Sequence, residues 1–261
     1  MTRPSYPMPY NNTDLTGQVA LVTGASAGLG RRFALTLASA GAAVAVGARR
    51  KDRLEELREE IESAGGRCLP ISLDMTEPDQ IVDAVAVAEQ ELGPVQILVN
   101  NAGIPDAMRA HKMPLELINK VIDTNIRGPY ILACEVARRL IAAKLPGRIV
   151  NISSMAAYSY DGAGAATLYS ISKSASARMT EVLAVEWARY GINVNAIAPG
   201  LTSSEMADGM LERMGDFSVH FPRKRVTDPA MLDGTLLLLC SPSAEAVTGT
   251  VVKIDDGQSP R

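Results

Sequence analysis

Residues 19–30 read Val-Ala-Leu-Val-Thr-Gly-Ala-Ser-Ala-Gly-Leu-Gly, and this stretch decides which fold the sequence predicts. Its first four residues are a short apolar run typical of a buried strand, and the glycines after them are typical of a tight turn. Segment 31–40 then continues with the amphipathic pattern of a helix. A strand, a glycine turn and a helix in this order indicate the first unit of an α/β domain.

Strand and helix patterns continue to alternate along the rest of the chain. We expect strands at 43–46, 68–73, 96–99, 148–152, 193–197 and 249–254, and helices at 52–64, 78–92, 115–125, 127–143, 168–190 and 231–241. Because the strands lack the alternating polarity of a half-exposed sheet, both faces of the sheet should be covered by helices. We therefore predict an α/β fold with a doubly wound parallel sheet, whose ligands bind beyond the carboxyl ends of the strands.

The 261 residues favour one large domain at 15–261, preceded by an N-terminal tail at 1–14. Segment 201–229 has the least regular pattern, with methionines and two phenylalanines among polar residues, and we interpret it as a mobile substrate lid. A surface excursion that packs its own methionines would have the same composition.

Composition and charge argue against several classes of partner. The net charge of −3 and the scattered basic residues give no reason to expect nucleic acid. Residues 1–14 lack the apolar run of a signal peptide and no later segment is apolar enough to span a membrane, so we expect a cytoplasmic protein. Two histidines and three widely separated cysteines make a metal site hard to assemble, so none is predicted.

The glycine turn is the first candidate binding site. Gly24, Gly28 and Gly30 have the spacing G-x-x-x-G-x-G. Glycines let the backbone approach a phosphate, and the free N–H groups at the start of the next helix attract negative charge. We expect the pyrophosphate of a dinucleotide to bind at Gly24, Ser26, Ala27, Gly28, Leu29 and Gly30. A tight strand-to-helix turn without any ligand is the alternative.

The end of the second strand should contact the adenosine ribose. Residues 47–50 read Gly-Ala-Arg-Arg, without a carboxylate to accept the ribose hydroxyls, and Arg49 can form a fork onto a 2′-phosphate. NADP(H) is therefore preferred, with NAD(H) possible. Arg49 and Arg50 as plain solvated residues at the start of a charged helix are the competing interpretation. Asp74 is placed to bond the adenine amino group, although an aspartate that caps its own turn would look the same.

Tyr169 and Lys173 are the candidate acid and its helper. Four residues apart on a predicted helix, they lie on the same face, one turn from each other. A phenol titrates near ~10, and a neighbouring ammonium favours the phenolate and so lowers that pKa. A half-buried tyrosine against the stem of a solvent-facing lysine would show the same spacing.

Several motifs occur together and in a fixed order. These are Gly24-x-x-x-Gly28-x-Gly30, Asn100-Asn101-Ala102-Gly103, Ser153-Ser154, Tyr169-x-x-x-Lys173 and Pro199-Gly200. With them, residues 17–257 resemble the classical short-chain dehydrogenase/reductase family, and within it 3-oxoacyl carrier-protein reductase-like and gluconate 5-dehydrogenase-like members. The resemblance implies a Rossmann-type sheet, an NAD(P) cofactor and interconversion of a ketone and a secondary alcohol.

The resemblance also implies roles for individual residues. The catalytic tetrad corresponds to Asn125, Ser154, Tyr169 and Lys173: a water holder, a carbonyl anchor, the acid/base, and a lysine that lowers the tyrosine pKa and binds the nicotinamide ribose. Further cofactor contacts are expected from Met75, Asn101, Ala102, Gly103, Pro199, Gly200, Thr202 and Ser204, with Tyr169 and Lys173. Ala27 departs from the family pattern, since many NADPH-preferring relatives carry a basic residue there, which leaves the preference to Arg49.

Substrate and assembly are predicted only in outline. Pro105-Asp106, Met155-Ala156, Tyr160 and the lid should line a mainly apolar pocket, which suits a ketone, a secondary alcohol or an acyl chain. The helices at 127–143 and 168–190 carry more apolar residues than one core face requires, so we expect a homodimer or homotetramer.

Two other functions compete with an oxidoreductase. Residues 24–28 also match G-x-S-x-G, the nucleophile elbow of serine hydrolases, in which Ser26 would need His111 or His220 as a base. The other is a noncatalytic NADP-binding sensor, although such proteins usually lack a member of the tetrad, and all four are present here.

Overall fold

The structure is a computed structural model that describes residues 11–160, 162 and 164–259. One sheet of seven parallel strands has the order β3-β2-β1-β4-β5-β6-β7. The strands are β1 Val19–Thr23, β2 Ala43–Ala48, β3 Arg67–Ser72, β4 Val95–Asn100, β5 Gly147–Ile152, β6 Ile192–Pro199 and β7 Val251–Ile254. This confirms the predicted doubly wound parallel sheet.

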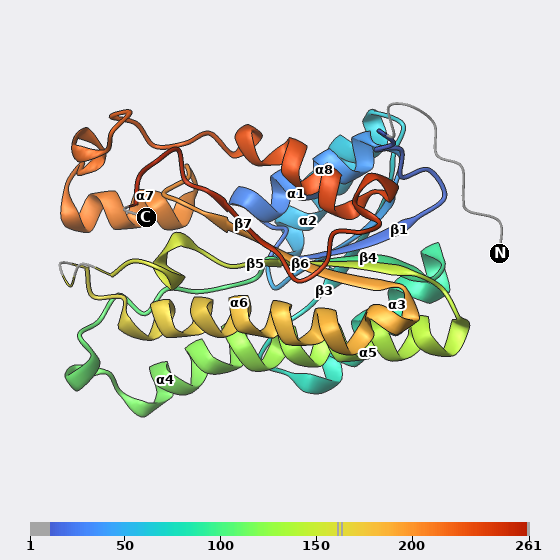
Figure 1. Ribbon diagram of the computed structural model, residues 1–261, viewed down its shortest axis with the longest axis horizontal. Helices are drawn as coiled ribbons and strands as arrows, with labels where there is room; N and C mark the ends of the chain where they lie inside the picture. Colours follow the sequence, from blue (N-terminus) through green and yellow to red (C-terminus); the bar gives the residue numbers. More distant parts are fainter. Residues whose placement is uncertain (1–10, 161, 163, 260–261) are drawn as a thin grey trace.

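Helices cover both faces of the sheet, as Figure 1 shows. One face carries α1 Gly28–Ser39, α2 Lys51–Ser63 and α8 Asp233–Cys240, and the other carries α3 Pro78–Leu92, α5 Gly128–Ala143 and α6 Thr167–Trp187. Successive strand side chains point to opposite faces. Along β1, Ala20 and Val22 therefore join the first core, while Val19 and Leu21 join the second. Both cores need apolar residues, which explains the unbroken apolar run.

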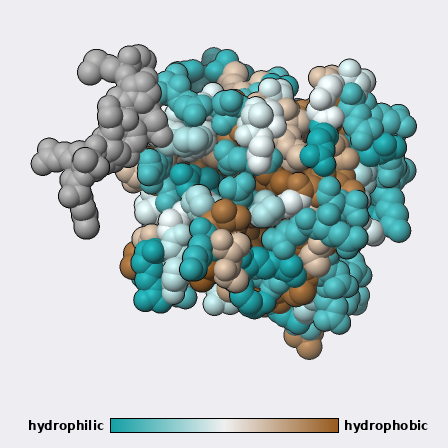
Figure 2. Space-filling model, turned by 90° about the vertical axis from the view of Figure 1, so that its right-hand side faces the viewer, coloured by the Kyte–Doolittle hydropathy of each residue, from teal (hydrophilic) through white to brown (hydrophobic). Residues whose placement is uncertain are grey.

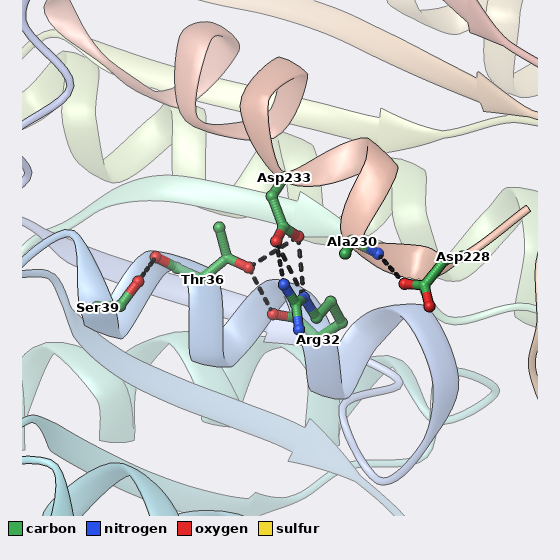
Figure 3. Close-up of polar contacts among 6 residues, drawn as sticks. All are labelled: Arg32, Thr36, Ser39, Asp228, Ala230 and Asp233. Carbon is green, nitrogen blue, oxygen red and sulfur yellow. Dashed lines mark hydrogen bonds and ion pairs between the residues drawn. The ribbon is translucent and has the colours of Figure 1, made fainter.

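An ion pair ties the first helix to the last one. The guanidinium of Arg32 in α1 bonds both carboxylate oxygens of Asp233 at the start of α8, with its Nε at 3.1 and 3.0 Å (Figure 3). The hydroxyl of Thr36 donates to the same carboxylate at 3.0 Å. Asp233 also lies in the first turn of α8, where a negative charge is favoured by the helix dipole. This cluster fixes α8 against α1.

The second face contains a continuous helical path that brings one predicted site residue inside. Helix α4 Leu115–Ile122 passes through a π-helical turn at Asp123–Arg127 directly into α5. Asn125 is buried in that turn. Single π-helical turns inside α-helices are frequent at functional sites, because the extra residue changes the direction of a side chain.

Segment 201–229 is more regular than its sequence pattern predicted. It contains helix α7, Glu205–Met214, and a 3₁₀ turn at Ser218–His220. The hydroxyl of Ser204 caps α7 by accepting from the N–H of Ala207 at 3.2 Å. The segment with the least regular sequence pattern therefore contains a helix. Its serine cap and the four-residue spacing of Met206, Met210 and Met214 were the helical signals in the sequence.

The two ends of the sheet differ in what they expose. In Figure 1 the carboxyl ends of the strands point toward α7, and the chain enters β1 at the opposite end. Hydrophilic residues cover most of that opposite end, with smaller hydrophobic areas between them (Figure 2). None of the described helices combines the length and the apolar character that crossing a bilayer requires.

Candidate active site

A cavity of about 940 Å³ lies at the carboxyl ends of the strands. The loops after β1, β4, β5 and β6 border it, and α7 closes one side. Most of the residues selected from the sequence border this cavity: Gly24, Ser26, Ala27, Gly28, Leu29, Arg49, Arg50, Asp74, Met75, Asn101, Ala102, Gly103, Ser154, Tyr169, Lys173, Pro199, Gly200, Thr202 and Ser204. Gly30 and Asn125 do not border it. Gly30 packs against Gly24, and Asn125 is hydrogen-bonded to Ile104, so each contacts a residue that does.

The glycine turn leaves no room for side chains. A Cβ on Gly30 would lie 2.3 Å from the carbonyl oxygen of Gly24, so only glycine lets α1 begin against the end of β1. Gly24 and Gly28 have positive φ angles of 67° and 53°, which glycine adopts without strain. The N-cap residue of α1, Ala27, has no side chain that could accept its first N–H groups. The free N–H groups beside the cavity fit a bound pyrophosphate.

Asn101 supports this turn from the neighbouring strand. Its Nδ2 donates to the carbonyl oxygens of Thr23 at 2.9 Å and Gly24 at 3.3 Å. Its backbone N–H donates to the Thr23 hydroxyl at 3.1 Å. The ends of β1 and β4, which are adjacent and parallel in the sheet, are thereby held together at the point where the strand order reverses. This is the usual ligand position in this kind of fold.

The two arginines after β2 have different partners. Arg50 donates from Nε to the Ser26 hydroxyl at 3.2 Å and forms an ion pair with Glu205 of α7 at 3.0 Å. The Arg49 side chain is 61% exposed and its Nη1 lies 3.9 Å from the Asp74 carboxylate. Arg49 is therefore the less constrained of the two cations. Glu205 as a partner at this end of the cavity was missed from the sequence.

Asp74 serves its own turn, as the alternative interpretation proposed. Its Oδ1 accepts from the N–H and the hydroxyl of Thr76 at 3.0 and 2.9 Å. The side chain still borders the cavity. Capping of the turn therefore orients the carboxylate without removing it from reach of a ligand.

Ser154 and Tyr169 meet at the inner part of the cavity. Ser154 follows β5, and its Oγ accepts from the N–H of Ala156 at 3.1 Å. The Ser154 hydroxyl is also hydrogen-bonded to the Tyr169 phenol. Burial raises the pKa of Tyr169 above its ordinary value, and this bond lowers it by less. In this structure burial, rather than a neighbouring ammonium, sets the direction of the tyrosine pKa.

Lys173 is buried one helical turn farther along α6. Its Nζ donates to the carbonyl oxygen of Ile152 at 2.7 Å and lies 5.6 Å from the centre of the Tyr169 ring. Burial lowers the pKa of Lys173 to about 8, so the ammonium form still predominates at neutral pH. The interpretation of Lys173 as a solvent-facing residue was wrong, since only 5% of it is exposed.

Asn125 connects the loop after β4 with α6. Its Oδ1 accepts from the N–H of Ile104 at 2.9 Å, and its Nδ2 donates to the Ile104 carbonyl at 2.9 Å and to the Ser172 hydroxyl at 3.0 Å. Both amide hydrogens are therefore used within the protein. A Cβ on Gly103 would lie 3.4 Å from the Nζ of Lys173 and 3.5 Å from the Oδ1 of Asn125, so Gly103 lies beside both side chains.

Asp106 is a residue whose role the sequence did not reveal. We expected it to line the pocket, but its buried carboxylate accepts from the N–H of Leu168 at 2.7 Å and of Tyr169 at 3.3 Å. The N-cap residue of α6, Ala166, cannot provide this acceptor. Asp106 therefore caps the helix that carries Tyr169 from 62 residues upstream. No local pattern announces such a contact, because caps are normally supplied by the adjacent residue.

The cavity wall gives little support to a hydrolase. Ser26 accepts from Arg50, and neither His111 nor His220 is among the described residues that border the cavity.

Tyr160, expected to line the pocket, instead donates to the carbonyl oxygen of Gly164 at 2.9 Å. Within the described residues, no group of three or more histidine, cysteine, aspartate or glutamate side chains could hold a metal ion.

Comparison with known proteins gives consistent relatives. The family model for short chain dehydrogenases matches residues 18–214. A 2-dehydro-3-deoxy-D-gluconate 5-dehydrogenase from Dickeya dadantii is 34% identical over 253 residues, covering 96% of this chain and 98% of that protein. The crystal structure of a short-chain type dehydrogenase/reductase from Mycobacterium marinum superposes with a TM-score of 0.92 at 36% identity, covering 96% and 98% of the two chains. The crystal structure of an actinorhodin polyketide ketoreductase with NADPH superposes with a TM-score of 0.88 at 31% identity, covering 94% of this chain and 98% of that one.

The cap at Asp106 predicts a selective loss of stability. Asp106→Ala leaves the N–H groups of Leu168 and Tyr169 without an acceptor, so the free energy of unfolding should fall by about 1–2 kcal/mol. Asp106→Asn keeps one oxygen and should lose less. Urea denaturation measures both. Asp216→Ala is the matched control, because Asp216 accepts from Ser218 at an exposed turn. Equal stability of Asp106→Ala and the unaltered chain would contradict the capping role.

Proposed function

Because this chain belongs to the short chain dehydrogenase family, we propose that it interconverts a ketone and a secondary alcohol by hydride transfer, with Tyr169 as the acid and base. Membership of the family makes it an NAD(P)-dependent oxidoreductase. The tyrosine's role, the preferred cofactor and the assembly below are our inferences from the geometry.

The observation that carries the proposal is the pairing of Ser154 with Tyr169 at the wall of the cavity. During reduction Tyr169 donates its phenolic proton to the carbonyl oxygen, and the Ser154 hydroxyl orients and polarises that oxygen. The raised pKa of Tyr169 keeps the phenol protonated before the reaction. During oxidation the same oxygen accepts the proton from the alcohol.

Lys173 acts after the proton has left. The phenolate formed on Tyr169 would be costly in a buried site without a nearby positive charge. The Lys173 ammonium, 5.6 Å from the centre of the ring, supplies that charge. Asn125 positions Ile104 and Ser172, and the second lone pair of its Oδ1 binds a water that links Lys173 to solvent in our proposal.

NADP(H) is the proposed cofactor, and NAD(H) is the less preferred alternative. When bound, it supplies or accepts the hydride. The turn at 24–30 binds the pyrophosphate. Arg49, which is 61% exposed and lies only at a long 3.9 Å from Asp74, binds a 2′-phosphate. NADPH in the crystal structure of the related actinorhodin ketoreductase supports this choice.

Segment 201–229 serves as the substrate lid in this proposal. Helix α7 lies over the cavity and is held at its first residue by the ion pair between Glu205 and Arg50. Both partners are largely exposed, so this ion pair is weak enough to open and close.

A homodimer or homotetramer would cover the outer faces of α5 and α6. Tyr130 on α5 is 50% exposed, and Ile171, Val182 and Val185 on α6 are 55%, 44% and 82% exposed. Both helices lie on one side of the sheet, with α4 beside them (Figure 1). A second copy of the chain on this face would remove these apolar side chains from water.

Replacement of Tyr169 by phenylalanine tests the chemistry. Tyr169→Phe removes only the phenolic oxygen, so NADPH oxidation with a panel of ketones should fall by roughly 100-fold or more. NADPH binding, measured by fluorescence titration, should persist. Tyr158→Phe is the control, because Tyr158 is exposed on the neighbouring loop. Near-normal turnover by Tyr169→Phe would reject the assignment, and absence of turnover in the unaltered chain would favour the noncatalytic sensor.

The cofactor preference rests on Arg49. Arg49→Asp replaces the proposed 2′-phosphate ligand by a carboxylate that repels phosphate and can accept the ribose hydroxyls. The ratio of kcat/KM for NADPH over NADH should fall by roughly tenfold or more. Arg53→Asp, one turn farther along α2 and exposed, controls for the change of charge. An unchanged ratio would leave Arg49 as a plain surface residue.

The assembly is tested on the most exposed apolar residue of α6. Val185→Glu places a charge on the proposed interface, and sedimentation equilibrium should show a shift from dimer or tetramer toward monomer. Val87→Glu, an exposed valine on α3, is the control. A monomeric unaltered chain would exclude the proposed interface.

A further inference from the structure

Helix α7 presents one mixed face to the cavity. The residues of this helix that border the cavity on that face are Met206, Met210, Arg213 and Met214. Their spacing of four, seven and eight residues from Met206 puts them on one side of a helix. Phe217 and Phe221 continue the same wall, with ring centres 5.7 Å apart and planes at 88°. The wall is apolar except for a single cation.

Arg213 lies at one edge of that apolar face, next to Met206. At 100° per residue its direction falls within about 20° of Met206, with Met210 on the other side. A Cβ on Gly209 would lie 3.4 Å from the Nη1 of Arg213, so the guanidinium rests against the helix where this glycine leaves space. The side chain therefore folds back along α7 toward the preceding turn, at the border of the cavity.

Arg213 lacks the kind of partner that the other arginines at this cavity have. Arg49 lies near Asp74 and Arg50 pairs with Glu205, both at the cofactor end. No ion pair found among residues 11–160, 162 and 164–259 includes Arg213. An uncompensated guanidinium bordering a cavity attracts an anion, and its planar fork matches a carboxylate.

The rest of the substrate side is uncharged with one exception. Ile104, Pro105, Met155 and Ala156 form apolar surface near Ser154 and Tyr169. Apart from the buried Lys173 beside Tyr169, Lys120 of α4 is the other cation that borders the cavity away from the cofactor end. Methionine side chains adapt to different shapes, so the wall selects weakly by shape. Charge at Arg213 is then the feature that discriminates among substrates.

We propose that the substrate is an apolar keto acid: its ketone reacts at Ser154 and Tyr169, and its carboxylate, at the far end of an apolar chain, binds Arg213. The inference rests on the proposed oxidoreductase function and adds the class of substrate to it. The methionine face of α7 covers the apolar chain between the two ends. Arg213 is the specificity-determining residue, and it takes no part in the proton or hydride transfer.

Paired substrates of equal length test the inference. The probes are 6-oxoheptanoate, 8-oxononanoate and 10-oxoundecanoate, each beside its methyl ester, with NADPH oxidation as the readout. The unaltered chain should show a higher kcat/KM for at least one acid than for its ester. Arg213→Met, which continues the methionine face, should lower the ratio of acid to ester by roughly 10–100-fold, mainly through the KM of the acid. Arg213→Lys should restore part of the ratio.

Two controls separate the possible failures. Lys120→Met removes the other cation and should leave the acid-to-ester ratio close to that of the unaltered chain. Loss of the ratio in Lys120→Met but not in Arg213→Met would overturn the assignment of Arg213. Ready reduction of the esters and neutral ketones without a preference for any acid would overturn the keto-acid inference while the proposed function stands. Failure to reduce any ketone in the panel would overturn both.

Discussion

The start of α1 packs directly onto the backbone of the turn that precedes it, and the geometry of the whole cofactor end depends on this contact. A Cβ on Gly30 would lie 2.3 Å from the Gly24 carbonyl oxygen, so the helix can begin there only without a side chain. Asn101 donates to the same carbonyl from the end of β4. Three segments thus share one point of close approach, and the free N–H groups of α1 face the cavity because of it.

A second constraint acts at the other end of the cavity, where ionisable groups are held out of water. Burial raises the pKa of Tyr169 and lowers that of Lys173, so each group favours its neutral form more than in solution. This balance suits a reversible proton transfer, because the phenol starts protonated and the lysine still carries charge near neutral pH. Asp106, in the loop after β4, and Asn125, in the π-helical turn, are hydrogen-bonded to α6 and hold it in place near Tyr169 and Lys173.

Helix α7 joins the two ends of the cavity. Glu205 at its start pairs with Arg50 beside the cofactor region, and Arg213 near its end lies beside the substrate region. The helix is short and held by few polar contacts, which fits a segment of low local stability that moves with ligand binding. A change in the position of α7 would therefore alter both regions together.

The sequence by itself determined the parallel sheet, the glycine turn and the order of the motifs, because these depend on local patterns of apolar residues and on glycine's backbone freedom. It also identified Ser154, Tyr169 and Lys173, which lie close together in the structure. Only the tertiary structure decided that Asp106 caps α6, that Glu205 pairs with Arg50, and that Arg213 borders the cavity. These residues and their surroundings are far apart in the chain and meet only in the folded protein. The burial that shifts the pKa values of Tyr169 and Lys173 likewise arises only when the chain has packed.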